Sequence, residues 1–209
     1  MVTVASDTTN PSVLRGQGSG MIVAAFFGAM WVSWAHSWLG RLPDPVCWSI
    51  YAAAAAITIA LLAAGIAAIR RARREYDTGN TSPAVRRRIW RRYWLVVIAE
   101  VVVLNLLAAG LMGNGLGQYL PPAFAIVVGM HFFPLARIFR VPHFHATAIL
   151  MTLSGCAATL AIVSGQSAVV AGGANDLACA VALWGTAFVS WLRTREPSKA
   201  DQAALVRAG

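Results

Sequence analysis

The chain has 209 residues, of which 58% are hydrophobic and only 12% are charged. Soluble domains carry about 25% charged residues, so this composition excludes an ordinary soluble fold and indicates a protein solvated mainly by lipid. The formal net charge of +9 comes from arginines that lie between the apolar stretches, a distribution typical of cytoplasmic membrane loops. A nucleic-acid-binding protein is therefore not expected.

Six stretches are apolar and long enough to cross a bilayer, which takes about 20 residues of helix. We therefore predict an all-α, polytopic membrane protein with a six-transmembrane-helix bundle over residues 20–192. A polar segment at residues 1–19 and a charged tail at residues 193–209 flank it. The predicted spans are residues 20–39, 46–69, 93–113, 118–139, 145–164 and 168–192.

The basic residues predict the orientation of these spans. Arginines gather between the second and third spans, between the fourth and fifth, and after the sixth, whereas only Arg41 lies on the opposite side. Cytoplasmic loops carry the excess of basic residues, and an even number of spans places both termini together. We expect a multi-pass protein of the plasma (inner) membrane with cytoplasmic N and C termini.

The first predicted span follows a glycine-rich segment, residues 16–20, which we expect to be a flexible lead-in. It ends near Trp31, Trp34 and Trp38, which are interpreted as anchors because indole rings favour the headgroup region. His36, which lies among them, is interpreted as an interfacial residue.

The second predicted span carries small residues at four-residue spacing, Ala56, Ala60 and Ala64, beside Gly65. Small residues allow helices to approach closely in lipid, where apolar burial gives little drive to associate. This span is predicted to pack against other helices, and it is a candidate interface for a homo-oligomer.

Basic and aromatic residues alternate ahead of the third span, in a helix predicted to start near Pro83 and to run on into the membrane. Each basic residue gains about 1 kcal/mol near anionic headgroups, so we expect anionic lipid to be a partner here. The expected lipid-interface anchors are Arg86, Arg87, Arg88, Arg91, Arg92, Trp90 and Trp94.

Two ionisable residues are expected at similar depth in neighbouring antiparallel spans. Glu100 lies about 10 Å and His131 about 13 Å from the cytoplasmic boundary at 1.5 Å per residue. Because each favours the charged form of the other, we predict that they pair. Pro134 is predicted to kink the helix beside His131 as a gate, and Asn105 lies about 140° around the helix from Glu100.

The fifth and sixth spans add further polar residues. His143 and His145 start the fifth and are read either as interfacial residues or, with His131, as ligands of a metal site. The hydroxyl groups of that span are expected to serve packing more than to line a pore. Asp176 shares a small-residue face with Gly172 and Ala180, so it is expected to face protein.

Ionisable groups inside a membrane are candidates for function. Four polar residues are expected at different depths in the bilayer: Glu100, His131, Asp176 and Asn105. This arrangement favours a small transporter or channel for a solute or ion, in which transport could be coupled to protons. One alternative is an intramembrane enzyme or a metal- or haem-binding protein with its site near the cytoplasmic face. The other is a structural or accessory subunit; an enzyme is the less favoured class, and no cofactor is predicted outside the first alternative.

Overall fold

The computed structural model describes residues 11–74, 83–139 and 141–195, and this part of the chain is all-helical, as predicted. Most of the predicted N-terminal segment, the linker at residues 75–82, Arg140 and the tail from residue 196 lie outside the described residues. The described elements are α1 (Pro11–Trp34), α2 (His36–Leu39), α3 (Asp44–Arg74), α4 (Pro83–Gly113), the 3-10 helix η2 (Gly117–Tyr119), α5 (Leu120–Phe139), α6 (His143–Val163) and α7 (Ala168–Arg193).

Among the described helices, 5 stretches are long and apolar enough to cross a membrane, which suggests a membrane protein. They lie in α3, α4, η2 with α5, α6 and α7. The helix α1 is not among them, although it has 24 residues. Its first half is less apolar and contains Gln17 and Ser19. As predicted, α4 starts at Pro83 and continues through the apolar stretch without a break.

The first predicted span differs most from expectation. Instead of one helix over residues 20–39, α1 runs from Pro11 to Trp34, and a turn at Ala35 leads into the short α2. The glycine-rich residues 16–20 are helical and were wrongly expected to be a flexible lead-in. A Cβ on Gly18 would lie 2.8 Å from the carbonyl oxygen of Gly65, so the glycines allow α1 and α3 to cross closely.

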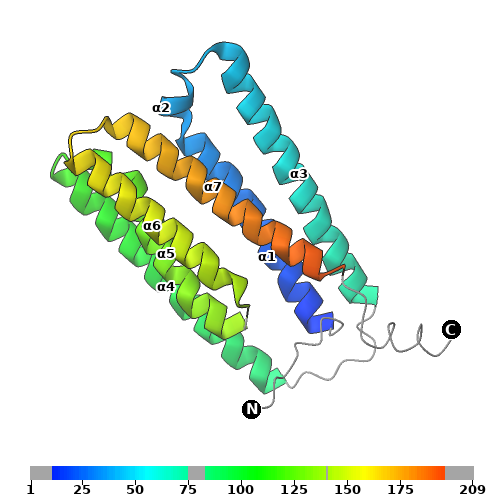
Figure 1. Cartoon of the computed structure of the whole chain (residues 1–209). Coiled ribbons are helices and arrows are strands. Elements are labelled where there is room, and N and C mark those ends of the chain that lie inside the picture. The colour runs from blue at the N-terminus through cyan, green and yellow to red at the C-terminus, as the bar shows by residue number, and fades with distance from the viewer. Residues whose placement is uncertain (1–10, 75–82, 140, 196–209) are drawn as a thin grey trace.

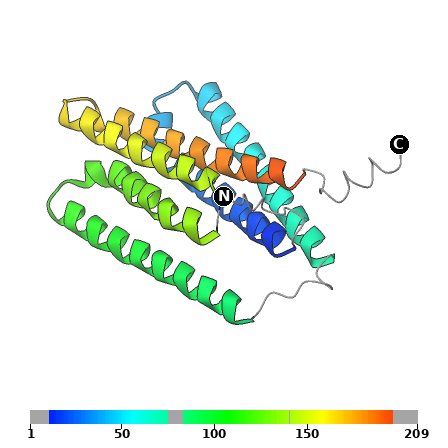
Figure 2. The same cartoon turned by 60° about the horizontal axis from the view of Figure 1, so that its bottom comes forward.

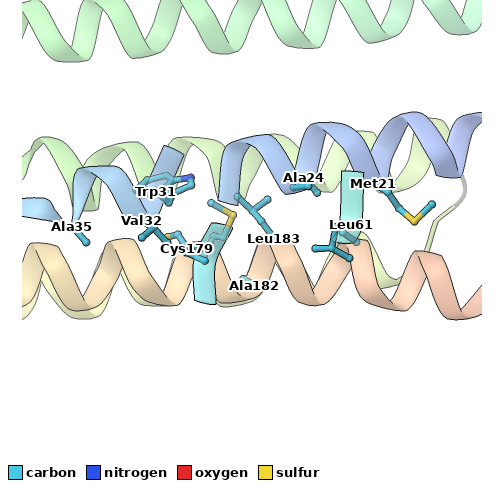
Figure 3. Close-up of a cluster of buried hydrophobic side chains, with 14 of the residues drawn as sticks. Met21, Ala24, Trp31, Val32, Ala35, Leu61, Cys179, Ala182 and Leu183 are labelled. Atoms are coloured by element: carbon cyan, nitrogen blue, oxygen red, sulfur yellow. The ribbon is translucent and has the colours of Figure 1, made fainter. Parts of the chain in front are cut away.

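The helix α7 is at the centre of the bundle, in contact with α1, α2, α3, α5 and α6 (Figure 1). Its side chains meet those of α1 in an apolar core that includes Met21, Trp31, Cys179 and Leu183 (Figure 3). Small residues are frequent in this core, which brings the helix axes close together. The core therefore fixes α1 against α7, and α3 adds Ala54, Leu61 and Ala68 to it and contacts both helices.

Two of the tryptophans interpreted as interface anchors belong to the core instead. Trp31 is only 1% exposed. Trp38 packs over Gly173, where a Cβ would collide with its side chain. Trp34, in contrast, is 41% exposed and lies against the ring of Phe124. An indole is the largest apolar side chain, so it serves a core as readily as an interface wherever a glycine faces it.

The alanine stripe of α3 does not face the bundle as the sequence predicted. Ala56 and Ala60 are exposed and Ala64 is only partly buried. The face that packs inward carries the residues one position later in the sequence, Leu61 and Gly65, together with other small residues. Because α3 is rich in alanine on every side, the spacing of small residues did not identify its contact face.

The helix α4 lies at the edge of the bundle, where α5 is its main partner. Figure 2 shows α4 apart from α1, α3 and α7. In the described chain, no residue between Trp90 and Gly113 is fully buried, and large apolar side chains such as Leu95 and Leu106 are exposed. One narrow face of α4 therefore makes its contacts with the rest of the protein.

The helix ends that carry arginines meet at one end of the bundle. Arg71, near the end of α3, donates a hydrogen bond to the carbonyl of Thr194, directly after α7, over 3.4 Å. His143, at the start of α6, is 2.9 Å from Ser190 of α7, and Tyr93 of α4 lies against Phe139 of α5. Arg41 lies between α2 and α3 at the opposite end.

Candidate functional site

Glu100 and His131 meet on the contact face between α4 and α5. The imidazole Nδ1 of His131 lies 3.2 Å from the Oε1 atom of Glu100, and the two side chains are only 13% and 14% exposed. The pairing expected from their depths is therefore present. An ionisable group at this depth is expensive to hold in lipid, and an opposite charge at ion-pair distance reduces that expense for both groups.

The geometry of the pair leaves capacity for further bonds. The Nδ1 atom is close to the carboxylate but is not aligned for a hydrogen bond, and Nε2 is also without a hydrogen-bond partner among the described residues. Both ring nitrogens are shielded from solvent. In a neutral imidazole one ring nitrogen is a donor and the other an acceptor, so both roles stay open to a further partner.

Pro134 lies three residues after His131, and α5 continues through it. Proline cannot donate to the carbonyl four residues earlier, so the carbonyl of Met130 loses its usual helical partner beside the imidazole. Phe132 lies next to the His131 ring, with 5.5 Å between the ring centroids. The pair thus lies beside a turn of α5 that lacks one helical hydrogen bond.

Asn105 does not join this pair. It is exposed on α4, and its amide donates a 2.7 Å hydrogen bond to the carbonyl of Val101 in the same helix. A hydrogen bond to the residue's own helix satisfies the amide without a partner helix. The structure therefore separates Asn105 from Glu100, in agreement with the 140° expected between them.

Asp176 is buried on α7, facing protein as expected, with only 2% exposure. Its Oδ1 atom accepts a hydrogen bond of 3.2 Å from the amide of Asn175, and the Oδ1 atom of Asn175 accepts one of 3.0 Å from the hydroxyl of Ser154. The thiol of Cys179 is 3.9 Å from the same Asn175 oxygen. These residues form a polar cluster between α6 and α7, separate from the Glu100 pair.

Further polar contacts join α6 to α7 between the start of α6 and Ser154. The hydroxyls of Thr147 and Thr186 are hydrogen-bonded to each other, and both are buried. Three side-chain pairs cross between the two helices: His143 with Ser190, Thr147 with Thr186, and Ser154 with Asn175. Hydroxyl groups of α6 thus serve packing, as the sequence favoured, with their partners on α7.

Thr186 and Ser190 were not identified from the sequence, although a signal was present. Asp176, Cys179, Leu183, Thr186 and Ser190 follow one another at alternating spacings of three and four residues. That spacing places all of them on one helix face, and all of them are buried. A face that includes a buried aspartate predicts that the polar residues in line with it are buried too.

The three histidines considered as metal ligands do not come together. His143 is bonded to Ser190, and the ring of His145 lies 5.9 Å from that of Phe133. Within the described part of the chain, no group of three or more His, Cys, Asp or Glu side chains is placed to hold a metal ion. The metal-site alternative therefore has no set of ligands in this region.

The aromatic and basic residues at the start of α4 face outward. Trp90 is 59% and Trp94 45% exposed, and Arg87, Arg91 and Arg92 are exposed as well. The side chains of Arg86 and Arg88 lie outside the described residues. Exposure of indole and guanidinium groups at one helix end suits contact with lipid headgroups.

Comparisons with protein-family models, curated proteins and solved structures gave no match.

Proposed function

We propose that this protein is a small integral membrane transporter or channel that moves protons or a proton-coupled solute, and that Glu100 and His131 form its proton-exchanging pair. The observation that carries the proposal is the 3.2 Å approach of two ionisable side chains from different helices, away from solvent. Such groups are expensive in a membrane, and they mark ion and proton pathways when present.

The position of the pair supports a role in movement. It joins α4, which has α5 as its main partner, to the part of α5 that contains Pro134. Adding a proton to Glu100, or removing one from a charged His131, removes the attraction between the two side chains. Proton exchange then loosens the contact between a peripheral helix and a helix with a weakened backbone, which is how a gate is coupled to a proton.

Asp176 is proposed as a second proton site, in the half of the proton path that is farther from the arginine-bearing end. Its carboxyl is buried, with one hydrogen bond from Asn175. In the proposed topology α1 and the five other long helices cross the membrane, and the arginine-bearing end lies in the cytoplasm. Glu100 and His131 then lie in the cytoplasmic half of the bilayer, and Asp176 lies in the outer half.

Flux measurements in proteoliposomes test the proposal. Purified protein is reconstituted with a pH-sensitive dye inside the vesicles, and a pH gradient is imposed. We expect the wild type to carry protons, and we expect Glu100→Gln and His131→Gln each to reduce the flux to that of empty vesicles. Asp176→Asn should reduce the flux as well, because the amide cannot take up a proton.

Asn105→Leu is the matched control, since it removes a polar side chain from the same helix as Glu100 but on its exposed face. This variant should carry protons like the wild type. All variants are first compared by size-exclusion chromatography to confirm that they are folded. Equal flux in the wild type and in Glu100→Gln would refute the role of the pair.

A further inference from the structure

A groove runs between α3 and α7 near the end of the bundle that carries the arginines. The groove between the two helices has a volume of about 450 Å³. A second hollow of about 520 Å³ adjoins it on the surface of α3 and shares Ala63, Ala67 and Arg71 with it. The apolar lining is given by Ala60, Leu61, Ala63, Ala64, Ala67, Ala68 and Phe188.

Three arginines line one end of the two hollows, Arg70, Arg71 and Arg195, and the last two have their guanidinium groups held in place. Arg71 donates a hydrogen bond to the carbonyl of Thr194 over 3.4 Å, and the Cζ atom of Arg195 lies 3.8 Å from the ring centroid of Trp191. Both arginines are exposed. The described residues that line the two hollows include no acidic side chain. Among the described residues that line it, the mouth of the groove therefore carries only positive charge.

The apolar lining of the groove belongs to the apolar stretches of α3 and α7. The apolar stretch of α3 ends at Ile69 and that of α7 at Leu192. If both helices cross a membrane, Arg71 and Arg195 therefore come at its boundary. From Ala60 to Arg71 the wall of the groove is about 16 Å of helix at 1.5 Å per residue. An acyl chain can pack against an alanine surface as it packs against other acyl chains. Guanidinium groups bind phosphate oxygens through paired N–H donors.

We propose that this groove binds a phospholipid with an anionic headgroup, with an acyl chain along the alanines of α3 and its phosphate held by Arg71 and Arg195. A second copy of the chain is a poorer occupant, because a symmetric contact over this groove brings the same arginines toward one another. The site involves α3 and α7, whereas the proton pair belongs to α4 and α5. The two proposals therefore stand or fall separately.

Native mass spectrometry of the detergent-purified full chain tests the headgroup. Dioleoyl phosphatidylglycerol and dioleoyl phosphatidylcholine, which have the same chains, are added at increasing concentration, and glycerol 3-phosphate serves as the free headgroup. We expect the first phosphatidylglycerol to bind well before phosphatidylcholine, with no binding of glycerol 3-phosphate. Replacing both arginines in Arg71→Gln with Arg195→Gln should weaken that first binding about thirty-fold.

Arg41→Gln with Arg137→Gln is the matched control, because these two arginines are also exposed but do not line the groove. This variant should bind the first phosphatidylglycerol like the wild type. Equal binding of the two phospholipids by the wild type, or equal weakening in both double variants, would overturn the proposal. Binding of glycerol 3-phosphate with the affinity of the lipid would also overturn it, since the site would then be a simple anion site.

A second pair of variants tests the apolar part. Ala67→Phe fills the groove, whereas Ala55→Phe adds the same ring to an exposed position of α3 outside it. We expect the first to weaken phosphatidylglycerol binding at least ten-fold and the second to leave it unchanged. A wild-type dimer that Ala67→Phe converts to monomer, with lipid binding unaltered, would assign the groove to a second copy and overturn the proposal.

Discussion

Asn175 connects more polar groups than any other single side chain of the polar cluster between α6 and α7. Its amide donates to Asp176, and its carbonyl oxygen accepts from Ser154 with Cys179 nearby. Replacing it with a residue of similar size but no polar atoms leaves the Ser154 hydroxyl and the Asp176 carboxyl without this partner. A buried polar group left without a partner costs about 1–3 kcal/mol.

We therefore predict that Asn175→Leu lowers the free energy of unfolding by about 1–2 kcal/mol, since hydrogen bonds between membrane helices are worth about 0.6 kcal/mol on average, with values up to about 1.7. Unfolding by titration with a denaturing detergent, followed by circular dichroism, measures this change. Asn105→Leu should leave the stability unchanged, because that amide is bonded only within its own helix. Equal loss in both variants would mean that the cross-helix bond adds nothing.

At the scale of the helices, reciprocal glycines determine how closely α5 and α6 approach. A Cβ on Gly155 of α6 would lie 3.0 Å from the backbone nitrogen of Ile126, and one on Gly129 of α5 would lie 2.7 Å from that of Thr152. Neither backbone can yield without shifting the helix. The contact between the two helices depends on the absence of a side chain at both positions.

Gly155→Ala is accordingly expected to destabilise the protein by about 1–3 kcal/mol, the usual range for overpacking a close contact. Thermal unfolding in detergent, monitored by light scattering and fluorescence, provides the measurement. Gly110→Ala on α4 is the control, because a Cβ at that position meets nothing within 4 Å. If Gly155→Ala unfolded at the same temperature as Gly110→Ala, the prediction would be wrong, because α5 and α6 would then accommodate the extra methyl group without loss of stability.

The sequence predicted where the helices are far better than which faces they bury. Apolar length is a local property, so the bounds of α4, α6 and α7 agree with expectation to within a few residues of the apolar stretch. Lipid and protein interior are equally apolar, however, so composition did not distinguish the buried Trp31 from an anchor, nor the exposed Ala56 and Ala60 from a contact face.

Polar residues carried the information that apolar residues did not. Glu100 and His131 were expected to pair because their depths agree and an isolated charge is expensive in lipid, and they lie 3.2 Å apart. The partners of His143 and Thr147 on α7 depend on how α6 and α7 are rotated, which no local pattern fixes. The approach of Gly18 to Gly65 likewise depends on the crossing of α1 and α3 and was not foreseen.

At the scale of the whole molecule, the gathering of arginines at one end argues for a single orientation. Arg71 contacts the end of α7, and Gly18, near the start of α1, packs against Gly65, near the end of α3. At the other end, the Nδ1 atom of His36 lies 3.0 Å from the hydroxyl of Tyr51. The helix α1 therefore extends from the arginine-bearing end toward the opposite end, beside α3.

This arrangement predicts the outcome of cysteine labelling in intact cells. In a background with the three native cysteines replaced by alanine, single cysteines are placed at five exposed positions: Gly16, Pro43, Asn114, Pro142 and Gln166. If the arginine-bearing end is cytoplasmic, a membrane-impermeant maleimide labels Pro43→Cys, Asn114→Cys and Gln166→Cys from outside. Gly16→Cys and Pro142→Cys should be labelled only after the membrane is opened.

Each departure from this pattern has a distinct meaning. Complete reversal would place the arginine-bearing end outside. Labelling of Asn114→Cys and Gln166→Cys from opposite sides would mean that only one of α5 and α6 crosses the membrane, since these two helices separate the positions. Labelling of Gly16→Cys and Pro43→Cys from the same side would mean that α1 does not span. Because α1 carries Gln17 and Ser19 in its first half, that last comparison decides between five spans and six.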